Sequence, residues 1–338
     1  MSDSDVHLDK GWDDLEQGDL AGARRVAEHE LHEDPENPEA LLLLAACCRS
    51  GNDFEEALHL LERASDVAPD WSAPEQWMAE IMAQELDSPA EALEHARVAL
   101  ERAEEEDEFL DAVGLKAGLE IQLGKIKAAQ ATLAELPPFA EVELSTDASL
   151  DFAYLFLEAE MIEQAELRFR VLAERDEGDG EAWYGLGLCA EERGDEPAKK
   201  DAWLRVLSID EKSPLESARM TESEMAEVAE QALKELPAKV HKLIENVPIL
   251  IVDLPAKQEV EQGLDPRLLG LFEGSAYSDA STVGGPVQVT RILLFRKNLE
   301  RMAIDTDDLR EQIRITLLHE TGHFFGMSEN DLANVGLD

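Results

Sequence analysis

Basic residues are scarce in this chain. Its 338 residues include 30 Lys and Arg against 76 Asp and Glu, which gives a formal net charge of −46 at pH 7. Nucleic acid and anionic membranes are themselves negative, so a surface of this charge repels both. We therefore expect neither among the partners. The acidic residues are spread along the chain rather than gathered in one block, a pattern typical of a solvated helical surface.

Cysteines and long apolar runs are also few. Cys47, Cys48 and Cys189 are odd in number and include an adjacent pair, which suits neither a disulfide framework nor a Cys-type zinc site. No apolar run approaches the length of a membrane span, and no charged segment followed by an apolar one opens the chain as in a secretory signal. We expect a soluble cytoplasmic protein whose cysteines are reduced and buried.

What the chain does have is a repeat. From residue 8 to about residue 214, alanine follows a turn signal at positions 23, 57, 92, 129 and 165, at spacings of 34, 35, 37 and 36 residues. A sixth turn, Arg193-Gly194-Asp195, continues the series with Lys199 in place of the small residue. Periods near 34 with paired helical patterns indicate a solenoid of helix-turn-helix units.

These units resemble the tetratricopeptide repeat. The last unit carries the resemblance best, with Ala182-Trp183-Tyr184, Leu186-Gly187 and Gly194-Asp195. The resemblance implies an all-α tetratricopeptide-like solenoid over residues 6–214 that binds a protein or peptide. Lys and Arg are too sparse to indicate a clamp for an acidic peptide terminus, so a scaffold without a ligand groove is the alternative.

Two histidines lie within the first repeat. His29 and His32 share a helix face at i, i+3. We interpret them as a solvated pair rather than as a metal site.

A second domain is predicted over residues 218–338. Thr221 and Glu224 form the capping-box pattern that begins a helix, which we expect to run from Met225 to Leu236. Residues 246–254, 268–274 and 286–295 read as extended segments around a Gly- and Ser-rich loop. The sequence therefore predicts a small α+β domain of about 120 residues after the solenoid.

The motif that carries chemistry is His319-Glu320-Thr321-Gly322-His323. On a helix, the i, i+4 spacing places His319 and His323 one turn apart on one face, where both imidazoles can reach one metal ion. Glu320 lies beside the open position of that metal. There it can accept a proton from water, which makes it the candidate general base.

Zinc requires a third protein ligand, and only 15 residues follow His323. Gly326, three residues later, can take the left-handed conformation that ends a helix and turns the chain back. That return would bring Glu329 to the metal, as in HExxHxxGxx followed by an acid. Met327 comes too early for a Met-turn and no later Met exists, so a full metzincin is excluded.

From about residue 220 onwards the chain resembles the minimal zincin family of bacterial metallopeptidase-like proteins. The resemblance rests on Asn246-Val247-Pro248-Ile249, on residues 269–274, on Leu294-Phe295-Arg296 and on the motif helix. It implies zinc, with His319, His323 and Glu329 as ligands and Glu320 as the base. The family's acid is more often Asp, so Asp331 is held as a reserve ligand.

Two functions from different classes follow. The first is a zinc-dependent metallopeptidase whose repeats hold a protein substrate. We expect an extended substrate to add as a strand to an exposed sheet edge, the one that contains Val287 to Leu294. The second is a non-catalytic repeat scaffold with a structural or vestigial zinc site. The presence of Glu320 favours the first, because a structural site has no use for a base there.

Overall fold

The structure is a computed structural model that describes residues 3–137, 145–215, 218–236, 247–274 and 289–324. It divides into two compact units, Met1–Leu172 and Ala173–Asp338.

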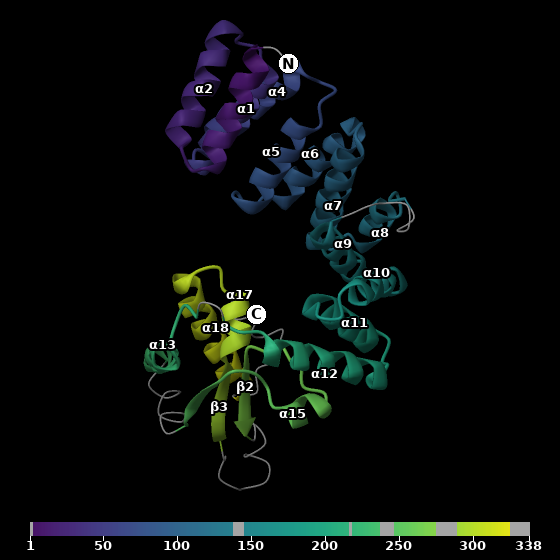
Figure 1. The fold of residues 1–338 in the computed structure, drawn as a ribbon, viewed down its shortest axis with the longest axis vertical. Helices are drawn as coiled ribbons and strands as arrows, with labels where there is room; N and C mark the ends of the chain where they lie inside the picture. The colour runs from purple at the N-terminus through teal and green to yellow at the C-terminus, as the bar shows by residue number, and fades with distance from the viewer. Residues whose placement is uncertain (1–2, 138–144, 216–217, 237–246, 275–288, 325–338) are drawn as a thin grey trace. The chain divides into compact units, whose positions relative to one another are not determined.

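The first unit consists of antiparallel helix pairs (Figure 1). Its helices are α1 (Asp3–Glu16), α2 (Leu20–Glu33), α3 (Pro38–Ser50), α4 (Phe54–Val67), α5 (Ala73–Gln84), α6 (Pro89–Arg102), α7 (Glu106–Gln122), α8 (Ile126–Leu133), α9 (Thr146–Glu158) and most of α10 (Ile162–Arg175). Each expected turn signal joins the two helices of one pair, so the repeat read from the sequence is the repeat of the fold.

The turns share one backbone feature. Each contains one residue with a positive φ, namely Gly18, Asn52, Asp87, Gly124, Glu160 or, in the second unit, Gly194. Glycine, asparagine and aspartate tolerate this conformation best, which explains the recurrent turn signals. In three turns the next residue is an aspartate whose carboxylate accepts a backbone hydrogen bond at the start of the following helix: Asp19, Asp53 and Asp195.

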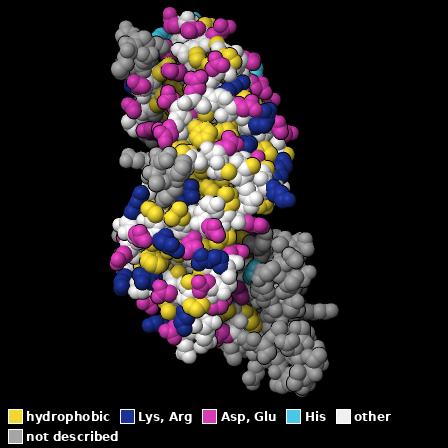
Figure 2. Space-filling view, turned by 90° about the vertical axis from the view of Figure 1, so that its right-hand side faces the viewer, with side chains coloured by type: hydrophobic (Ala, Val, Ile, Leu, Met, Phe, Trp, Pro, Cys, Tyr) yellow, Lys and Arg dark blue, Asp and Glu magenta, His cyan; other side chains and the backbone are white. Residues whose placement is uncertain are grey.

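The recurring small residues lie in the interior of the helical repeats. Ala23, Ala57, Ala92, Ala129 and Ala165 are all fully buried. The acidic side chains lie outside: Figure 2 shows Asp and Glu dispersed over the visible face, with Lys and Arg between them. Small residues therefore pack in the interior of the repeats, and charged residues form the solvated surface.

The second unit begins with a last helix pair and continues into an α+β part (Figure 1). Its elements are α11 (Gly180–Glu192), α12 (Glu196–Lys212), α13 (Glu222–Glu235), β1 (Ile249–Val252), α15 (Lys257–Glu261), β2 (Gly270–Gly274), β3 (Val289–Phe295), α17 (Arg296–Met302) and α18 (Thr306–Phe324). The capping box expected at Thr221 and Glu224 is present at the start of α13.

The described strands form one sheet in the order β1-β3-β2. β3 pairs parallel with β1, with Ile249 opposite Ile292, and antiparallel with β2, with Phe272 opposite Ile292. β3 is therefore the central strand, so the expectation that Val287 to Leu294 offers an exposed edge is wrong. In the described sheet the edges are β1 and β2.

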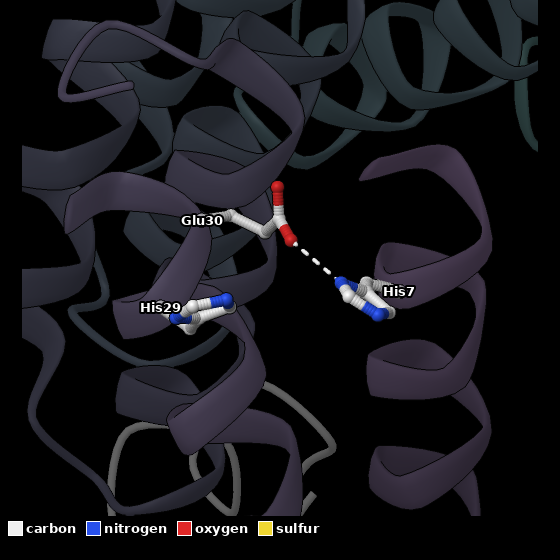
Figure 3. Close-up of side chains that lie close together, drawn as sticks. All are labelled: His7, His29 and Glu30. Carbon is white, nitrogen blue, oxygen red and sulfur yellow. Dashed lines mark hydrogen bonds and ion pairs between the residues drawn. The ribbon is translucent and has the colours of Figure 1, made fainter. Parts of the chain in front are cut away.

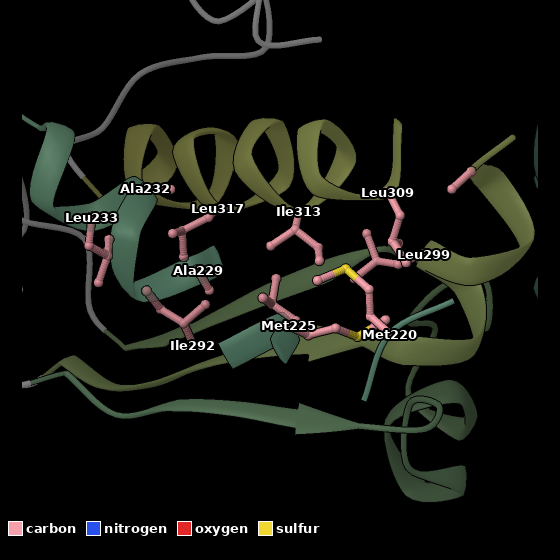
Figure 4. Close-up of a cluster of buried hydrophobic side chains, with 12 residues drawn as sticks. Met220, Met225, Ala229, Ala232, Leu233, Ile292, Leu299, Leu309, Ile313 and Leu317 are labelled. Carbon is pink, nitrogen blue, oxygen red and sulfur yellow. The ribbon is translucent and has the colours of Figure 1, made fainter. Parts of the chain in front are cut away.

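α13 and α18 cover one face of this sheet. Figure 4 shows Leu309, Ile313 and Leu317 of α18 directed towards the sheet and α13, and each of the three is fully buried. Met225 of α13 and Ile292 of β3 complete the contact. Burying side chains of this size stabilises the fold by about 1.5–3 kcal/mol each, which fixes α18 on the sheet.

The last helix pair is bound to the α+β part through charged residues. Asp210 near the end of α12 is 3% exposed and pairs with Arg301 of α17 at 2.6 Å and with Arg267 at 3.6 Å. Lys297 donates to the backbone carbonyls of Asp210 and Ser213 at 2.8 and 2.7 Å, where a helix end leaves carbonyls unsatisfied. α12 therefore ends in contacts that belong to the second unit.

The fold class expected from the sequence is confirmed: a tetratricopeptide-like helical solenoid is followed by a small α+β part. The compact units divide at residue 172, because α11 and α12 pack with the α+β part. The boundary between the repeats, 6–214, and the zincin-like domain, 218–338, stays a prediction. No helix in the described ranges is both long and apolar enough to cross a bilayer.

Candidate metal centre

The motif lies at the C-terminal end of α18. The helix begins at Thr306, and its N-cap is Asp305, whose carboxylate accepts from the backbone N–H groups of Asp307 and Asp308, both at 2.9 Å. Nineteen residues of continuous helix carry the chain to Phe324.

The helix places the first part of the motif as its spacing predicts. Glu320 follows Leu317 by three residues and so continues the core-facing stripe, and it is buried at 9% exposure. His319 lies one step round the helix and is half-buried. His323 is helical and lies one turn after His319, but its side chain is outside the described residues. The backbone thus supports one face for both imidazoles.

Glu320 reaches the edge strand of the sheet. Its Oε2 accepts a hydrogen bond from the backbone N–H of Phe272 on β2 at 3.0 Å. The backbone N–H of Phe295 donates to the carbonyl of Leu269, so the backbone groups of Leu269 face β3. Successive residues of a strand direct their backbone groups to opposite sides, so the N–H of Phe272, three residues further along, points away from β3. The Glu320 carboxylate therefore lies at the outer edge of β2, where another strand would pair.

Gly270 makes this approach possible. A Cβ at this position would lie 2.6 Å from Thr316 Cγ2 and 3.3 Å from Glu320 Cγ. Only a residue without a side chain lets α18 lie this close to β2. Gly270 therefore fixes the distance between Glu320 and the strand.

We expect Gly270→Ala to weaken the α18–β2 contact by about 1–3 kcal/mol, the usual cost of overpacking. Hydrogen exchange measured by mass spectrometry should then be about 5- to 150-fold faster in α18 and β2. Gly118→Ala in α7 is the matched control, because its Cβ would meet nothing closer than 3.7 Å. Unchanged exchange in Gly270→Ala would show that the helix does not depend on this approach.

The remaining proposed ligands lie outside the described residues. These are Glu329 and the reserve ligand Asp331, together with the turn residue Gly326. The described part fits zinc in its donor chemistry, because two imidazole positions one turn apart beside a carboxylate are a set that zinc takes. Glu329 and Asp331 as third ligands remain predictions.

The chain consists of a helical-repeat solenoid followed by an α+β part that carries an HExxH helix, and known families match both parts. Residues 14–81 and 150–208 match families described as Tetratricopeptide repeat. Residues 244–337 match the family described as Zincin-like metallopeptidase. The expected architecture, tetratricopeptide repeats followed by a zincin-like segment, is thereby confirmed.

Three solved structures that match the chain have TM-scores of 0.46 to 0.49. PilF from Pseudomonas aeruginosa has 14% identity and a TM-score of 0.49, covering 62% of this chain and 93% of that one. The C-terminal part of a TPR repeat-containing protein from Cytophaga hutchinsonii has 13% identity and a TM-score of 0.49, covering 77% and 95%. YrrB, a TPR protein with an unusual peptide-binding site, has 18% identity and a TM-score of 0.46, covering 55% and 93%. No curated protein sequence matches the chain.

Sequence reasoning missed the partners of Glu320. Neither Phe272 nor Gly270 stands out by residue type, and Phe272 acts through its backbone N–H. One signal was available, because a glycine inside a strand pattern often marks a close approach of another segment. Leu269-Gly270-Leu271 has that form.

Proposed function

We propose that the chain is a zinc-dependent metallopeptidase in which Glu320 is the general base and the repeats hold a protein substrate. The observation that carries the proposal is the position of Glu320, which is on the motif helix and at the outer edge of β2. The family match over residues 244–337 supports it independently. His319, His323 and Glu329 would hold the metal, with Asp331 as the alternative to Glu329.

In this proposal the chain's own residues orient the reactants. Zinc, when bound, supplies Lewis acidity that polarises the scissile carbonyl and makes water acidic near neutral pH. Glu320 accepts the proton of the attacking water and passes it to the leaving amine. Its bond to Phe272 occupies one of about four lone-pair sites on a carboxylate, and it holds the base in a fixed orientation.

The outer edge of β2 is the proposed place for the peptide. An extended substrate that adds as a strand beside β2 would use backbone groups that alternate along its edge. The N–H of Phe272 is already bound to Glu320, so the substrate would pair with the other outward backbone groups of β2, beside the Glu320 carboxylate. The scissile bond would therefore come to lie beside the base as a result of strand pairing.

The repeats are proposed to bind a protein or peptide, as matches to the tetratricopeptide repeat over residues 14–81 and 150–208 support. Neither nucleic acid nor a membrane is proposed as a partner, because the net charge of −46 repels both. Cys47, Cys48 and Cys189 are buried and are not joined in disulfides. We propose the cytoplasm as the compartment, since reduced cysteines persist there.

One observation favours the second function, a repeat scaffold without catalysis. Glu320 is buried and holds the edge strand, so the residue has a structural use even without chemistry. In that case the zinc site would be structural or vestigial. Peptide cleavage separates the two functions.

The direct test is a peptide-library cleavage assay on the full chain. A peptidase predicts cleavage that a chelator abolishes and added zinc restores. An absence of cleavage across a broad library would favour the scaffold.

We also expect His323→Ala to lose the zinc of this centre. Purified wild-type protein dialysed against metal-free buffer should retain about one zinc per chain, because three protein ligands hold the ion. Metal analysis of His323→Ala should give almost none. His59→Ala, which removes a histidine of α4 far along the sequence from the motif, is the control. Undiminished zinc in His323→Ala would remove His323 from the site.

A further inference from the structure

The first helix pair brings together three side chains that can bind a metal. The ligand atoms of His7 on α1 and of His29 and Glu30 on α2 all lie within 4.8 Å of one another. Figure 3 shows His29 and Glu30 projecting towards His7, with a bond between Glu30 and His7. The histidines are exposed and Glu30 is 7% exposed. His29 is therefore paired with His7 in space rather than with His32, its neighbour in sequence.

The helix packing fixes this arrangement. Gly11 lies one turn after His7, and a Cβ on Gly11 would meet Val26 Cγ1 at 3.1 Å and Leu43 Cδ2 at 2.4 Å. Val26 in turn lies three residues before His29. A close contact between α1 and α2 thus lies one helical turn away from the three side chains, and the backbones hold His7 opposite His29 and Glu30.

The distances suit one small cation. His7 Nδ1 and Glu30 Oε1 are 3.2 Å apart. Two ligands at zinc distances of about 2.1 Å and this separation would subtend about 100° at the metal, between octahedral and tetrahedral values. The ligand atoms of the three residues lie within 4.8 Å of one another, which is a wider spacing than the roughly 3.4 Å between neighbouring ligands of tetrahedral zinc. A rotation of the exposed His29 ring can supply the difference.

Two positive side chains near the site, Lys10 and Arg25, are directed to partners other than the three proposed ligands. Lys10, which lines the cavity of about 450 Å³ next to His7 and His29, lies 3.9 Å from Asp14. Arg25 directs its Nε to the backbone carbonyl of Ala21. The strongly negative chain attracts divalent cations in general. The open cavity leaves room for water in the remaining coordination positions.

We propose that His7, His29 and Glu30 form a second zinc site that clamps α1 onto α2 at the beginning of the solenoid. Two imidazoles and one carboxylate form a donor set that zinc takes, and magnesium, which prefers oxygen ligands, would not compete well. The site does not depend on the motif helix or on the proposed peptidase activity. Because both of its histidines are exposed, it should exchange zinc with the buffer.

Histidine modification with diethyl pyrocarbonate, read by mass spectrometry, tests the site on the wild-type chain. A metal-bound imidazole is not nucleophilic, so zinc at ten times its Kd should slow the modification of His7 and His29 by about tenfold. His32 on the same helix should react at an unchanged rate, and magnesium should protect none of the three. Equal rates for His7 and His29 with and without zinc would overturn the proposal.

Calorimetric zinc titration supplies a second measurement. It uses a His319→Ala, His323→Ala background, so that zinc binding at the C-terminal centre does not contribute. Adding His29→Ala should raise the remaining Kd by at least about tenfold, and adding His32→Ala instead should leave it unchanged. The same Kd for all three proteins would overturn the proposal. If the background fails to fold, the labelling experiment decides alone.

Discussion

Replacing Glu320 by Gln is expected to lower peptide turnover by about 10²- to 10⁴-fold, the usual contribution of a general base. Glutamine keeps the size of the side chain and an oxygen that can accept the hydrogen bond from Phe272 N–H. It loses the ability to take a proton from water. The zinc content and the α18–β2 contact should therefore stay as in the wild type, so the loss should appear in kcat.

Glu311→Gln is the matched control. Glu311 lies on the same helix and is exposed, and it pairs with Arg314 at 2.7 Å. The exchange removes the same charge from α18 without touching the site. A Glu320→Gln protein that cleaves as fast as wild type would remove Glu320 from the mechanism.

Glu320→Ala separates catalysis from the structural use of the residue. Alanine removes the acceptor for the part-buried Phe272 N–H, and the loss of such a hydrogen bond costs about 0.5–1.5 kcal/mol. If Glu320 serves only to hold β2, Glu320→Ala should loosen the strand while Glu320→Gln changes nothing. Hydrogen exchange in β2, measured on both variants, reports the structural use, and the turnover of Glu320→Gln reports the catalytic one.

The helical repeats could be predicted because their signals are local. Each turn requires one left-handed residue, and Gly18, Asn52 and Gly194 meet that requirement in the sequence as in the structure. The buried position after each turn has to be small, which the alanines reveal. Lys199 breaks that rule and is buried all the same, with its amine 2.9 Å from Glu196.

The motif helix was also predictable, but its surroundings were not. The apolar stripe and the i, i+4 histidines specify a helix through local spacing. The contact between Glu320 and Phe272 joins residues 48 positions apart through a backbone group. The group of His7, His29 and Glu30 is non-local in the same way, with 23 positions between His7 and Glu30. Single-sequence patterns do not identify the two members of such pairs.

The boundary between the compact units differs from the boundary predicted from the sequence for a related reason. The repeat period ends near residue 214, and the sequence places the boundary there. The contacts that bind α12 to the α+β part come from ordinary charged residues, Asp210, Arg267, Lys297 and Arg301. Their residue types do not distinguish them from the many solvated charges of this chain.

We expect Asp210→Asn to destabilise the second unit by about 3 kcal/mol. The change leaves Arg267 and Arg301 without their carboxylate, and breaking a buried ion pair by removing one partner costs about 3–5 kcal/mol. Arg267 keeps Glu181 at 2.6 Å, and the side chain of Arg301 is 34% exposed, so the lower end of the range applies. Hydrogen exchange should therefore become about 100-fold faster in both α12 and α17.

Asp201→Asn on the same helix is the control, because Asp201 is exposed and its pair with Arg205 at 3.3 Å is solvated. Such surface pairs contribute about 0–1 kcal/mol, so exchange in α12 and α17 should change little. Faster exchange of α12 alone in Asp210→Asn would mean that the last helix pair unfolds independently of the α+β part. Coupled loss of protection in α12, α17 and the sheet would instead make the last repeat an integral part of the unit that carries the motif helix, because Asp210 then stabilises both together.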